Sequence, residues 1–204
     1  MKILSTAYFP PIEYFAVLAK YSFDNVRIEA WENYQKQSYR NRCYFYGANG
    51  KEMLQVPVVH ENGSYQLPIK TIRIDYSTPW VARTKKAIAS AYSSAAYYEY
   101  YCDDIFAILD SKPEYLWELN LNILKFFLRS FGLDSKVQFT DDFTREGRVE
   151  IHPKKPYVFS QDQDYFQVFA HKQGFIQDLS AMDLLFNCGP ESKDYLLAMQ
   201  ELHI

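Results

Sequence analysis

The chain has 204 residues, of which 48% are hydrophobic and 23% are charged, and these proportions exclude an intrinsically disordered protein. Its net charge of -3 excludes a general electrostatic binder of nucleic acid, which needs clustered lysine and arginine. The cysteines Cys43, Cys102 and Cys188 lack the spacing of metal ligands, so we expect reduced thiols and no metal site.

Hydrophobic patterning points to a cytoplasmic protein. The N-terminal sequence MKILSTAYFPPIEYF contains an early Pro-Pro pair and an acidic residue, so we do not expect a signal peptide. No apolar run approaches the roughly 18 residues that a membrane helix needs, so no membrane span is expected. Aromatic residues make up 18% of the chain, and its tyrosines either pack the core or line a cleft that suits sugars and nucleotides.

The first third of the chain predicts strands joined by one helix. A buried strand, KILSTAYF, precedes Pro10-Pro11, a helix from Ile12 to about Tyr21 and a second strand, VRIEAW. This order indicates a βαβ unit with parallel strands, and the loop after its first strand is a common place for a ligand. The strands RCYFY and MLQVPVV surround an Asn-Gly turn and predict a β-hairpin. TIRID predicts one more short strand.

The remainder is predicted to be mainly helical. Helices are expected in WVARTKKAIASAY, over 95–109, and from Pro113 to a stop at Gly132. Residues 141–164 lack a sustained period and predict a long surface loop. A strand, YFQVF, a helix beginning after Ser180 and a last helix close the chain. The fold class is therefore α/β, a mixed sheet with an N-terminal βαβ unit and β-hairpin followed by several packed helices, in a single domain of residues 1–204.

Several catalytic motifs are absent from the sequence. It contains no GxGxxG, no GxxxxGK[ST] and no GxSxG, and its four histidines fall in unrelated contexts. Nucleotidyltransferases with a HIGH-type motif also carry a proline corner after strand one, but the two histidines are missing here, so they remain a fold-level alternative. The sequence thus identifies no cofactor.

A polar stretch, ENYQKQSYRNR, precedes the first hairpin strand. Arg40 and Arg42 are two residues apart, so in an extended chain they point to the same face. Together with Lys36 they could bind a phosphate or carboxylate, because arginine suits two-point contact with such anions. The pair could equally neutralise acids such as Asp183. We expect this stretch to form the anion-binding wall of a pocket.

Four sequence blocks carry a family resemblance. They are YFPPIEYFAVL, ENYQKQSYRNRCYFYGANGKEMLQVPV, PWVARTKKAIASAY and YFQVFAHKQGFIQDLSAMDLLFNCGPESKDYL, and they span nearly the whole chain. In them the chain resembles the WbqC-like family, whose members are encoded in bacterial O-antigen and polysaccharide clusters. The resemblance implies a glycine transferase role on a sugar. Relatives carry a histidine one helical turn after Trp80, where this chain has Thr84.

Two functional hypotheses follow. The first is an aminoacyl or acyl transferase that acts on a nucleotide-linked or other activated sugar. The second is a non-catalytic module that binds a sugar nucleotide or a biosynthetic partner; the oligomeric state stays open. Catalysis is assigned to Lys36 and to Glu13 as the candidate base, with a helix-dipole carboxylate as the alternative for Glu13. Ligand binding is assigned to Tyr8, Tyr14, Tyr34, Gln37, Arg40, Asn41, Arg42, Trp80, Tyr92, Tyr165, Gln167, Asp183 and Asn187.

Overall fold

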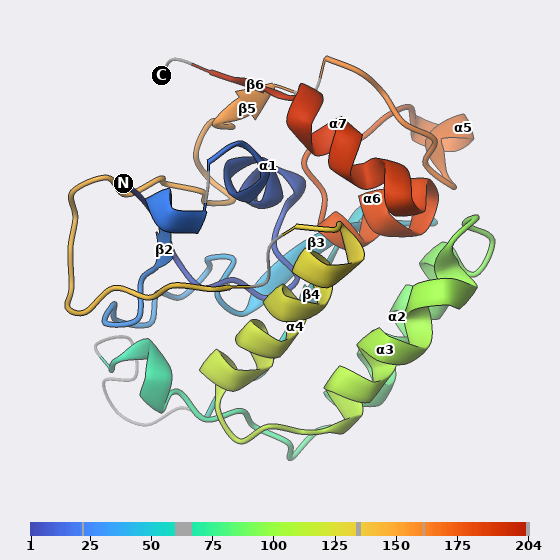
Figure 1. Ribbon diagram of the computed structural model, residues 1–204. Helices are drawn as coiled ribbons and strands as arrows, with labels where there is room; N and C mark the ends of the chain where they lie inside the picture. Colours follow the sequence, from blue (N-terminus) through green and yellow to red (C-terminus); the bar gives the residue numbers. More distant parts are fainter. Residues whose placement is uncertain (22, 60–66, 134–135, 161, 203–204) are drawn as a thin grey trace.

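The computed structural model describes residues 1–21, 23–59, 67–133, 136–160 and 162–202. It has the predicted α/β class, with a parallel strand pair and an antiparallel hairpin in the N-terminal part, followed by packed helices (Figure 1). Within these ranges no helix combines the length and the apolar character needed to cross a membrane.

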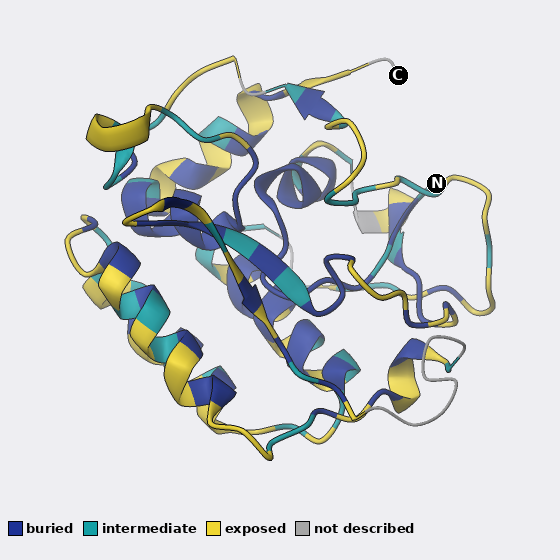
Figure 2. Cartoon of the chain, turned by 180° about the vertical axis from the view of Figure 1, so that it is seen from behind, coloured by how far each residue is buried: buried dark blue, intermediate teal, exposed yellow. Residues whose placement is uncertain are grey.

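The N-terminal βαβ unit is confirmed, with shorter strands than predicted. Strands β1 (Lys2–Leu4) and β2 (Val26–Ile28) pair in parallel. Helix α1 (Ile12–Lys20) and the 3-10 helix η1 (Phe23–Asn25) connect them. Helix α1 is central, and its residues from Ile12 to Leu18 are all buried (Figure 2). An amphipathic surface helix would expose one face, so α1 is a core helix.

Two stretches between residues 136 and 160 flank this strand pair. On the β2 side, the Ile28 N–H donates to the Gln138 carbonyl at 2.9 Å. On the β1 side, the Val149 N–H donates to the Ile3 carbonyl at 2.8 Å. Both contacts are parallel bridges in register with the central strands. Only the stretch on the β1 side belongs to the predicted surface loop of residues 141–164, and this contact brings a part of that loop to the carboxyl ends of β1 and β2.

The predicted hairpin is confirmed. Strands β3 (Arg42–Gly47) and β4 (Gly50–Gln55) are antiparallel, and Gly47 pairs with Gly50 across the two-residue turn. Gly50 has a φ of 107°, a conformation that favours glycine over residues with a side chain. The local turn chemistry thus determined the register.

Three helices follow, as predicted. They are α2 (Trp80–Tyr92), α3 (Tyr98–Asp110) and α4 (Leu116–Ser130), and α3 packs against both α2 and α4 (Figure 1). Gly132 ends the last of them with a φ of 61°. Figure 2 shows that α2 and α3 turn buried residues inward and exposed residues outward.

The C-terminal part consists of short elements, and its two longer helices pack on α1. In chain order they are β5 (Phe159–Ser160), α5 (Ala170–Gln173), α6 (Ala181–Cys188), η4 (Gly189–Glu191), α7 (Ser192–Ala198) and β6 (Gln200–Glu201). Helix α7 contacts α1, and β5 pairs with β6. The predicted helix after Ser180 is α6, and the Ser180 side chain accepts a hydrogen bond from the Met182 N–H at its start.

The predicted strand YFQVF is wrong. Residues 165–167 have no regular structure and pair with no strand in the part of the chain that the structure describes, and Phe166 is 68% exposed. The Gln167 side chain takes the role of a strand partner, since its amide accepts from the Ile176 N–H and donates to the Ile176 carbonyl, both at 2.9 Å. The alternating polarity of this segment therefore indicated that one of its faces is buried, but it did not indicate that the segment belongs to a sheet.

The predicted strand TIRID is also wrong as a regular element. Its first residue ends the 3-10 helix η3 (Ile69–Thr71). The next residues make single bridges in two directions, Arg73 to Tyr115 and Ile74 to Val58. Because each neighbour contacts one residue only, no ladder forms.

Aromatic rings fill the centre of the core. Phe15 lies 5.3 Å from Phe127 and 5.1 Å from Phe131 between ring centroids, and Phe9 lies 6.2 Å from Phe127. These edge-on and tilted contacts join the corner before α1, the helix itself and α4. Part of the high aromatic content is thereby explained by packing.

Candidate functional site

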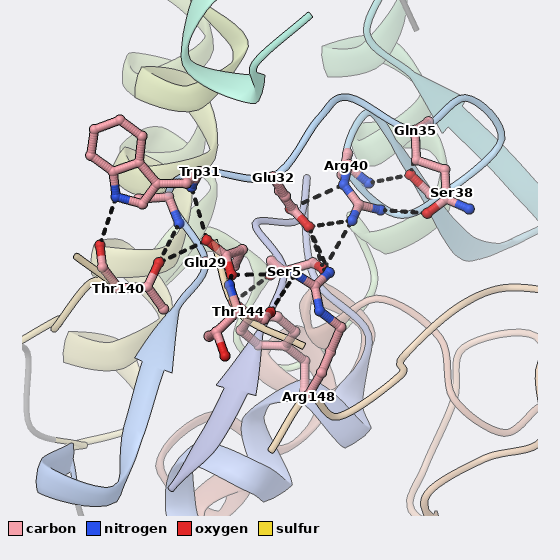
Figure 3. A network of polar contacts seen from close by, with 12 residues as sticks. Ser5, Glu29, Trp31, Glu32, Gln35, Ser38, Arg40, Thr140, Thr144 and Arg148 are labelled. Carbon is pink, nitrogen blue, oxygen red and sulfur yellow. Dashed lines mark hydrogen bonds and ion pairs between the residues drawn. The ribbon is translucent and has the colours of Figure 1, made fainter. Parts of the chain in front are cut away.

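The candidate site lies beyond the carboxyl ends of β1 and β2. Strand β1 runs directly into Ser5, and β2 runs into Glu29, with Glu32 three residues further on. Arg40 arrives from the polar stretch before β3, and Arg148 from the segment beside β1 (Figure 3). We call these five residues the arginine–glutamate cluster. Ligands commonly bind at this end of parallel strands in open α/β sheets.

Glu32 is the centre of the cluster and is 2% exposed. Its Oε1 accepts from Arg40 Nε at 3.0 Å, and Arg40 Nη2 donates to Oε2 in a second, close contact. Oε2 also accepts from Ser5 Oγ and from Arg148 Nη1, both at 3.0 Å. One carboxylate therefore holds two guanidinium groups, and the two-point contact fixes the plane of Arg40.

Glu29 anchors the other side of Arg148 and is fully buried. Its Oε2 accepts from Arg148 Nη2 at 3.3 Å and from the Thr144 N–H at 3.1 Å. Its Oε1 accepts from Thr140 Oγ1 at 2.7 Å and from the Trp31 N–H at 2.9 Å. These bonds attach the segment that carries Arg148 to the end of β2.

Two cavities open on the cluster. Both are lined by Gln35, Arg40 and Arg148. The first, of about 360 Å³, is further lined by Tyr34, Lys36 and Phe143. The second, of about 300 Å³, is further lined by Ser5, His152 and Lys155. We call them the Phe143 cavity and the His152 cavity. Both volumes fall at the lower end of the range for small-molecule sites, ~300–1,000 Å³.

The electrostatics of the Phe143 cavity favour an anion. The two guanidinium groups and the two buried carboxylates of the cluster balance one another, as buried charges must. Lys36 adds further positive charge at the wall of the Phe143 cavity. In the His152 cavity the charge of Lys155 is balanced by Glu150, which lines the same cavity and pairs with Lys155 at 3.0 Å. Lys36 thus supplies the attraction for a negatively charged ligand.

His152 adds a hydrogen-bonding group to the second cavity. Partial burial lowers its pKa, and the positive charges of Arg40, Lys154 and Lys155 lower it further. Its Nδ1 accepts from the Lys154 N–H at 3.2 Å, so the neutral ring carries its proton on Nε2. The ring can donate that proton in a hydrogen bond to an oxygen of a ligand.

The polar stretch before β3 is divided between this site and the interior. Tyr34, Lys36 and Arg40 line the Phe143 cavity, and Gln37 accepts from Lys154 Nζ at 2.8 Å. Burial raises the pKa of Tyr34, and the positive charges of Arg42 and Arg40 oppose that rise. Asn41 instead donates to the Val56 carbonyl at 2.9 Å.

Arg42 and Tyr14 do not line the two cavities. Arg42 begins β3, and its Nε is buried without a hydrogen-bond partner among the described residues. It does not line either cavity with Arg40. Tyr14 lies behind the cluster, where its hydroxyl donates to the Ser5 carbonyl at 3.0 Å and steadies the end of β1.

A second group of predicted residues forms a buried network on α6. Asp183 Oδ1 accepts from Tyr92 Oη at 2.9 Å, and Oδ2 accepts from Tyr165 Oη at 2.6 Å and from Gln167 Nε2 at 2.9 Å. Burial raises the pKa of Asp183 to about 6, and these three donors limit the rise. Asn187 donates to the Asp183 carbonyl at 2.7 Å. Asp183 is thus neither the helix cap nor a partner of the arginines.

Glu13 belongs to a third group. Its Oε2 accepts from the Val158 N–H at 2.7 Å, and its own N–H donates to Asp178 Oδ1 at 3.2 Å. Burial first, and the charge of Asp178 second, raise the pKa of Glu13 to about 8. Burial raises the pKa of Asp178 to about 7. This carboxyl pair connects α1 to the C-terminal part, and Glu13 does not line the two cavities.

Tyr8 and Trp80 lie in the core near Thr84. They are 0% and 5% exposed, and the Trp80 ring stacks on Tyr76 with 5.7 Å between centroids. Burial raises the pKa of Tyr8, and nearby Thr84 moderates that rise. The Tyr8 hydroxyl and Trp80 Nε1 have no hydrogen-bond partner of normal geometry in the described part of the chain. Tyr8 and Trp80 therefore belong to the core and are not part of the arginine–glutamate cluster.

A larger hollow, of about 600 Å³, lies at the start of α2. Ser77, Thr78 and Lys112 line it, and Lys85 pairs with Asp110 at 2.6 Å beside it. Its lining includes no buried charged side chain. We place the candidate site at the arginine–glutamate cluster, because fixed and buried charged groups are the more specific mark of a binding site.

Sequence reasoning missed Ser5, Glu29, Glu32, Gln35 and Arg148. Glu32 follows directly on the second predicted strand, so the rule for ligand sites in α/β sheets could have identified it. Ser5 and Glu29 lay inside the predicted strands, which were longer than the observed ones. Arg148 lies in a segment without periodicity, and no local signal showed that it returns to β1.

Two of three comparisons connect the chain to known proteins. A sequence model of the WbqC-like protein family matches residues 6–155, which include the whole arginine–glutamate cluster except Ser5. An uncharacterized protein of Mycobacterium tuberculosis, Rv1507c, is 26% identical over 228 residues, covering 95% of this chain and 96% of that protein. No solved structure matches the chain. Because the family model covers most of the chain, the protein belongs to the WbqC-like protein family.

Proposed function

We propose that the protein holds the phosphate groups of an activated sugar at the arginine–glutamate cluster and transfers an aminoacyl or acyl group to that sugar. Glycine is the leading candidate for the group transferred, and bacterial surface-polysaccharide synthesis is the process it would serve. One observation carries the proposal. Arg40 and Arg148, distant in sequence, meet at the carboxyl ends of β1 and β2 beside two cavities.

The binding part of the proposal rests on the donors of the cluster. Glu32 holds both guanidinium groups in place, so binding a phosphate requires little reorganisation of them. Lys36 lines the Phe143 cavity and adds a positive charge on a flexible side chain. This additional charge suits a diphosphate better than a single carboxylate. An activated sugar supplies such a group next to the sugar ring.

The transfer part needs a held acyl donor, a neutral amine on the acceptor and stabilisation of the developing oxyanion. The Nε2–H of His152 is the donor available for an oxyanion in the His152 cavity, because the Nη groups of Arg148 already donate to Glu29, Glu32 and the Thr144 carbonyl. Lys36 serves the phosphate. Glu13 is buried beside Val158, so its proposed role as a base would require that contact to open.

The experiment is a product assay with an internal control. The protein is incubated with nucleotide-activated amino sugars and, in separate arms, with glycine plus ATP, glycyl-tRNA and acyl thioesters, and mass spectrometry follows the sugar. We expect a glycyl or acyl unit on one sugar with the native protein and not with Arg148→Gln. No product in any arm, with the sugar nucleotides bound, contradicts transfer.

A second candidate function is binding of the sugar nucleotide without turnover. It is favoured by the saturation of the cluster. Glu32 accepts from both arginines and Ser5, Glu29 accepts from Arg148 and from backbone N–H groups, and neither is free to act as a base. Saturable binding without product in the same assay supports this candidate, and product formation excludes it.

A further inference from the structure

Phe143 is an exposed aromatic side chain at the wall of the site. Half of its surface is exposed, although an apolar ring gains free energy from burial. It lines the same cavity as Lys36 and Arg40. The guanidinium carbon of Arg148 lies 5.4 Å from its ring centroid, and that of Arg145 lies 6.0 Å away. Both guanidinium groups lie over the ring in cation–π contact, and the half of the ring surface that stays exposed offers a flat apolar surface to a ligand.

The position of this ring is fixed by the cluster. The next residue, Thr144, donates its N–H to Glu29 at 3.1 Å and accepts from Arg148 Nη2 at 3.4 Å through its carbonyl. The backbone on one side of Phe143 is therefore held at the end of β2. A phenyl side chain has only two rotatable bonds, so stacking on it costs little conformational entropy.

The combination of groups in the Phe143 cavity matches one class of ligand. Its walls bring together the Phe143 ring, the Tyr34 phenol and the cations Lys36 and Arg40. A planar base with phosphates attached needs both a stacking surface and cationic donors within one small volume. A sugar phosphate needs the same cations and could place its C–H face on the ring.

We propose that Phe143 is the stacking wall of a nucleotide subsite, with the base against the ring and the diphosphate toward Lys36 and Arg40. This inference rests on the proposed function, because it names the part of the activated sugar that the cavity selects. The nucleoside, and not the sugar, is the part that Phe143 recognises.

The test is isothermal titration of the native protein, Phe143→Ala and Phe143→Tyr with ADP, GDP, CDP and UDP, inorganic pyrophosphate and glucose 1-phosphate. Phe166→Ala serves as a matched control, since Phe166 is 68% exposed and does not line the cavity. We expect Phe143→Ala to weaken at least one nucleotide by about 5- to 150-fold, the range for losing one stacked base. Pyrophosphate binding is unchanged, and Phe143→Tyr retains nucleotide binding.

The contrary outcomes are distinct. Equal nucleotide affinities of Phe143→Ala and Phe166→Ala overturn the subsite and leave the proposed function standing. Loss of glucose 1-phosphate binding without loss of nucleotide binding assigns the ring to the sugar and also overturns it. If the native protein binds neither pyrophosphate nor any nucleotide or sugar phosphate, the proposed function fails together with the subsite.

Discussion

At the scale of single residues, Glu32 determines how the cluster is held together. Replacing it by Gln keeps the shape but leaves Arg40 without its ion pair and Arg148 with Glu29 alone. We expect the free energy of unfolding to fall by about 3 kcal/mol, at the lower end for a broken buried pair because Arg148 keeps one partner. Urea denaturation measures the change.

The control for this variant is Glu114→Gln. Glu114 pairs with Arg73 at 3.1 Å, but both side chains are more than half exposed. Exposed pairs contribute little, about 0–1 kcal/mol. A loss in Glu32→Gln no greater than that in the control would show that the cluster does not stabilise the fold.

The carboxyl pair Glu13 and Asp178 predicts a pH dependence of stability. Their pKa values in the folded chain, about 8 and about 7, lie above the ordinary values of 4.5 and 3.8. Between these limits the folded state binds more protons than the unfolded state, so the free energy of unfolding falls as pH rises. Each such proton contributes a slope of at most about 1.4 kcal/mol per pH unit.

Glu13→Gln removes one of the two titrations and keeps an oxygen to accept from the Val158 N–H. The loss of stability between pH 5 and pH 8 should therefore be smaller in this variant than in the native protein. Asp194→Asn, an exposed change on α7, should leave the native slope intact. A Glu13→Gln slope as steep as the native one would mean that Glu13 is ionised across this range.

At the scale of elements, Gly147 allows the segment beside β1 to pack. It has a φ of 74°, and a Cβ there would lie 2.2 Å from the Met1 carbonyl oxygen. Gly147→Ala must therefore displace the backbone next to Arg148. We expect a loss of more than the roughly 1–2 kcal/mol that a left-handed conformation costs an alanine, measured by urea denaturation.

Gly132→Ala separates the two contributions. Gly132 has a φ of 61°, but a Cβ at this residue would meet no atom within 4 Å among the described residues. Gly132→Ala should therefore lose only the free energy of unfolding that the left-handed backbone conformation costs an alanine. Equal losses of stability in Gly132→Ala and Gly147→Ala would show that the segment beside β1 can shift without cost and does not hold Arg148 in place.

The elements that sequence patterns predicted well are those with local signals. The hairpin follows from an Asn-Gly turn, and α4 follows from apolar spacing and from the stop at Gly132. The incorrect strand over 165–169 had the alternation but no neighbouring strand. Gln167 bonds to Ile176 in place of a ladder, and a sequence pattern does not show such a side-chain substitute.

At the scale of the whole molecule, the predicted site residues do not converge on one pocket. Arg40 joins Glu32 and Arg148, Gln167 joins Asp183, and Glu13 joins Asp178. Tyr8 and Trp80 lie apart from these groups in the core. The polar stretch before β3 indicated Arg40 because its residue types are visible locally. The pairing with Arg148 depends on a long return of the chain to β1, and contacts of that kind leave no periodic signal.

We propose that the arginine–glutamate cluster binds the diphosphate of an activated sugar. The most direct test of this binding is the affinity of the native protein and of Lys36→Gln for nucleoside diphosphate sugars, titrated at two salt concentrations. Lys86→Gln on α2 is the control, since Lys86 is exposed and lies outside both cavities. We expect salt-sensitive binding that Lys36→Gln weakens by about 5-fold or more, or ~1 kcal/mol, while Lys86→Gln matches the native protein. Absence of binding, or equal affinities for the two lysine variants, would contradict it.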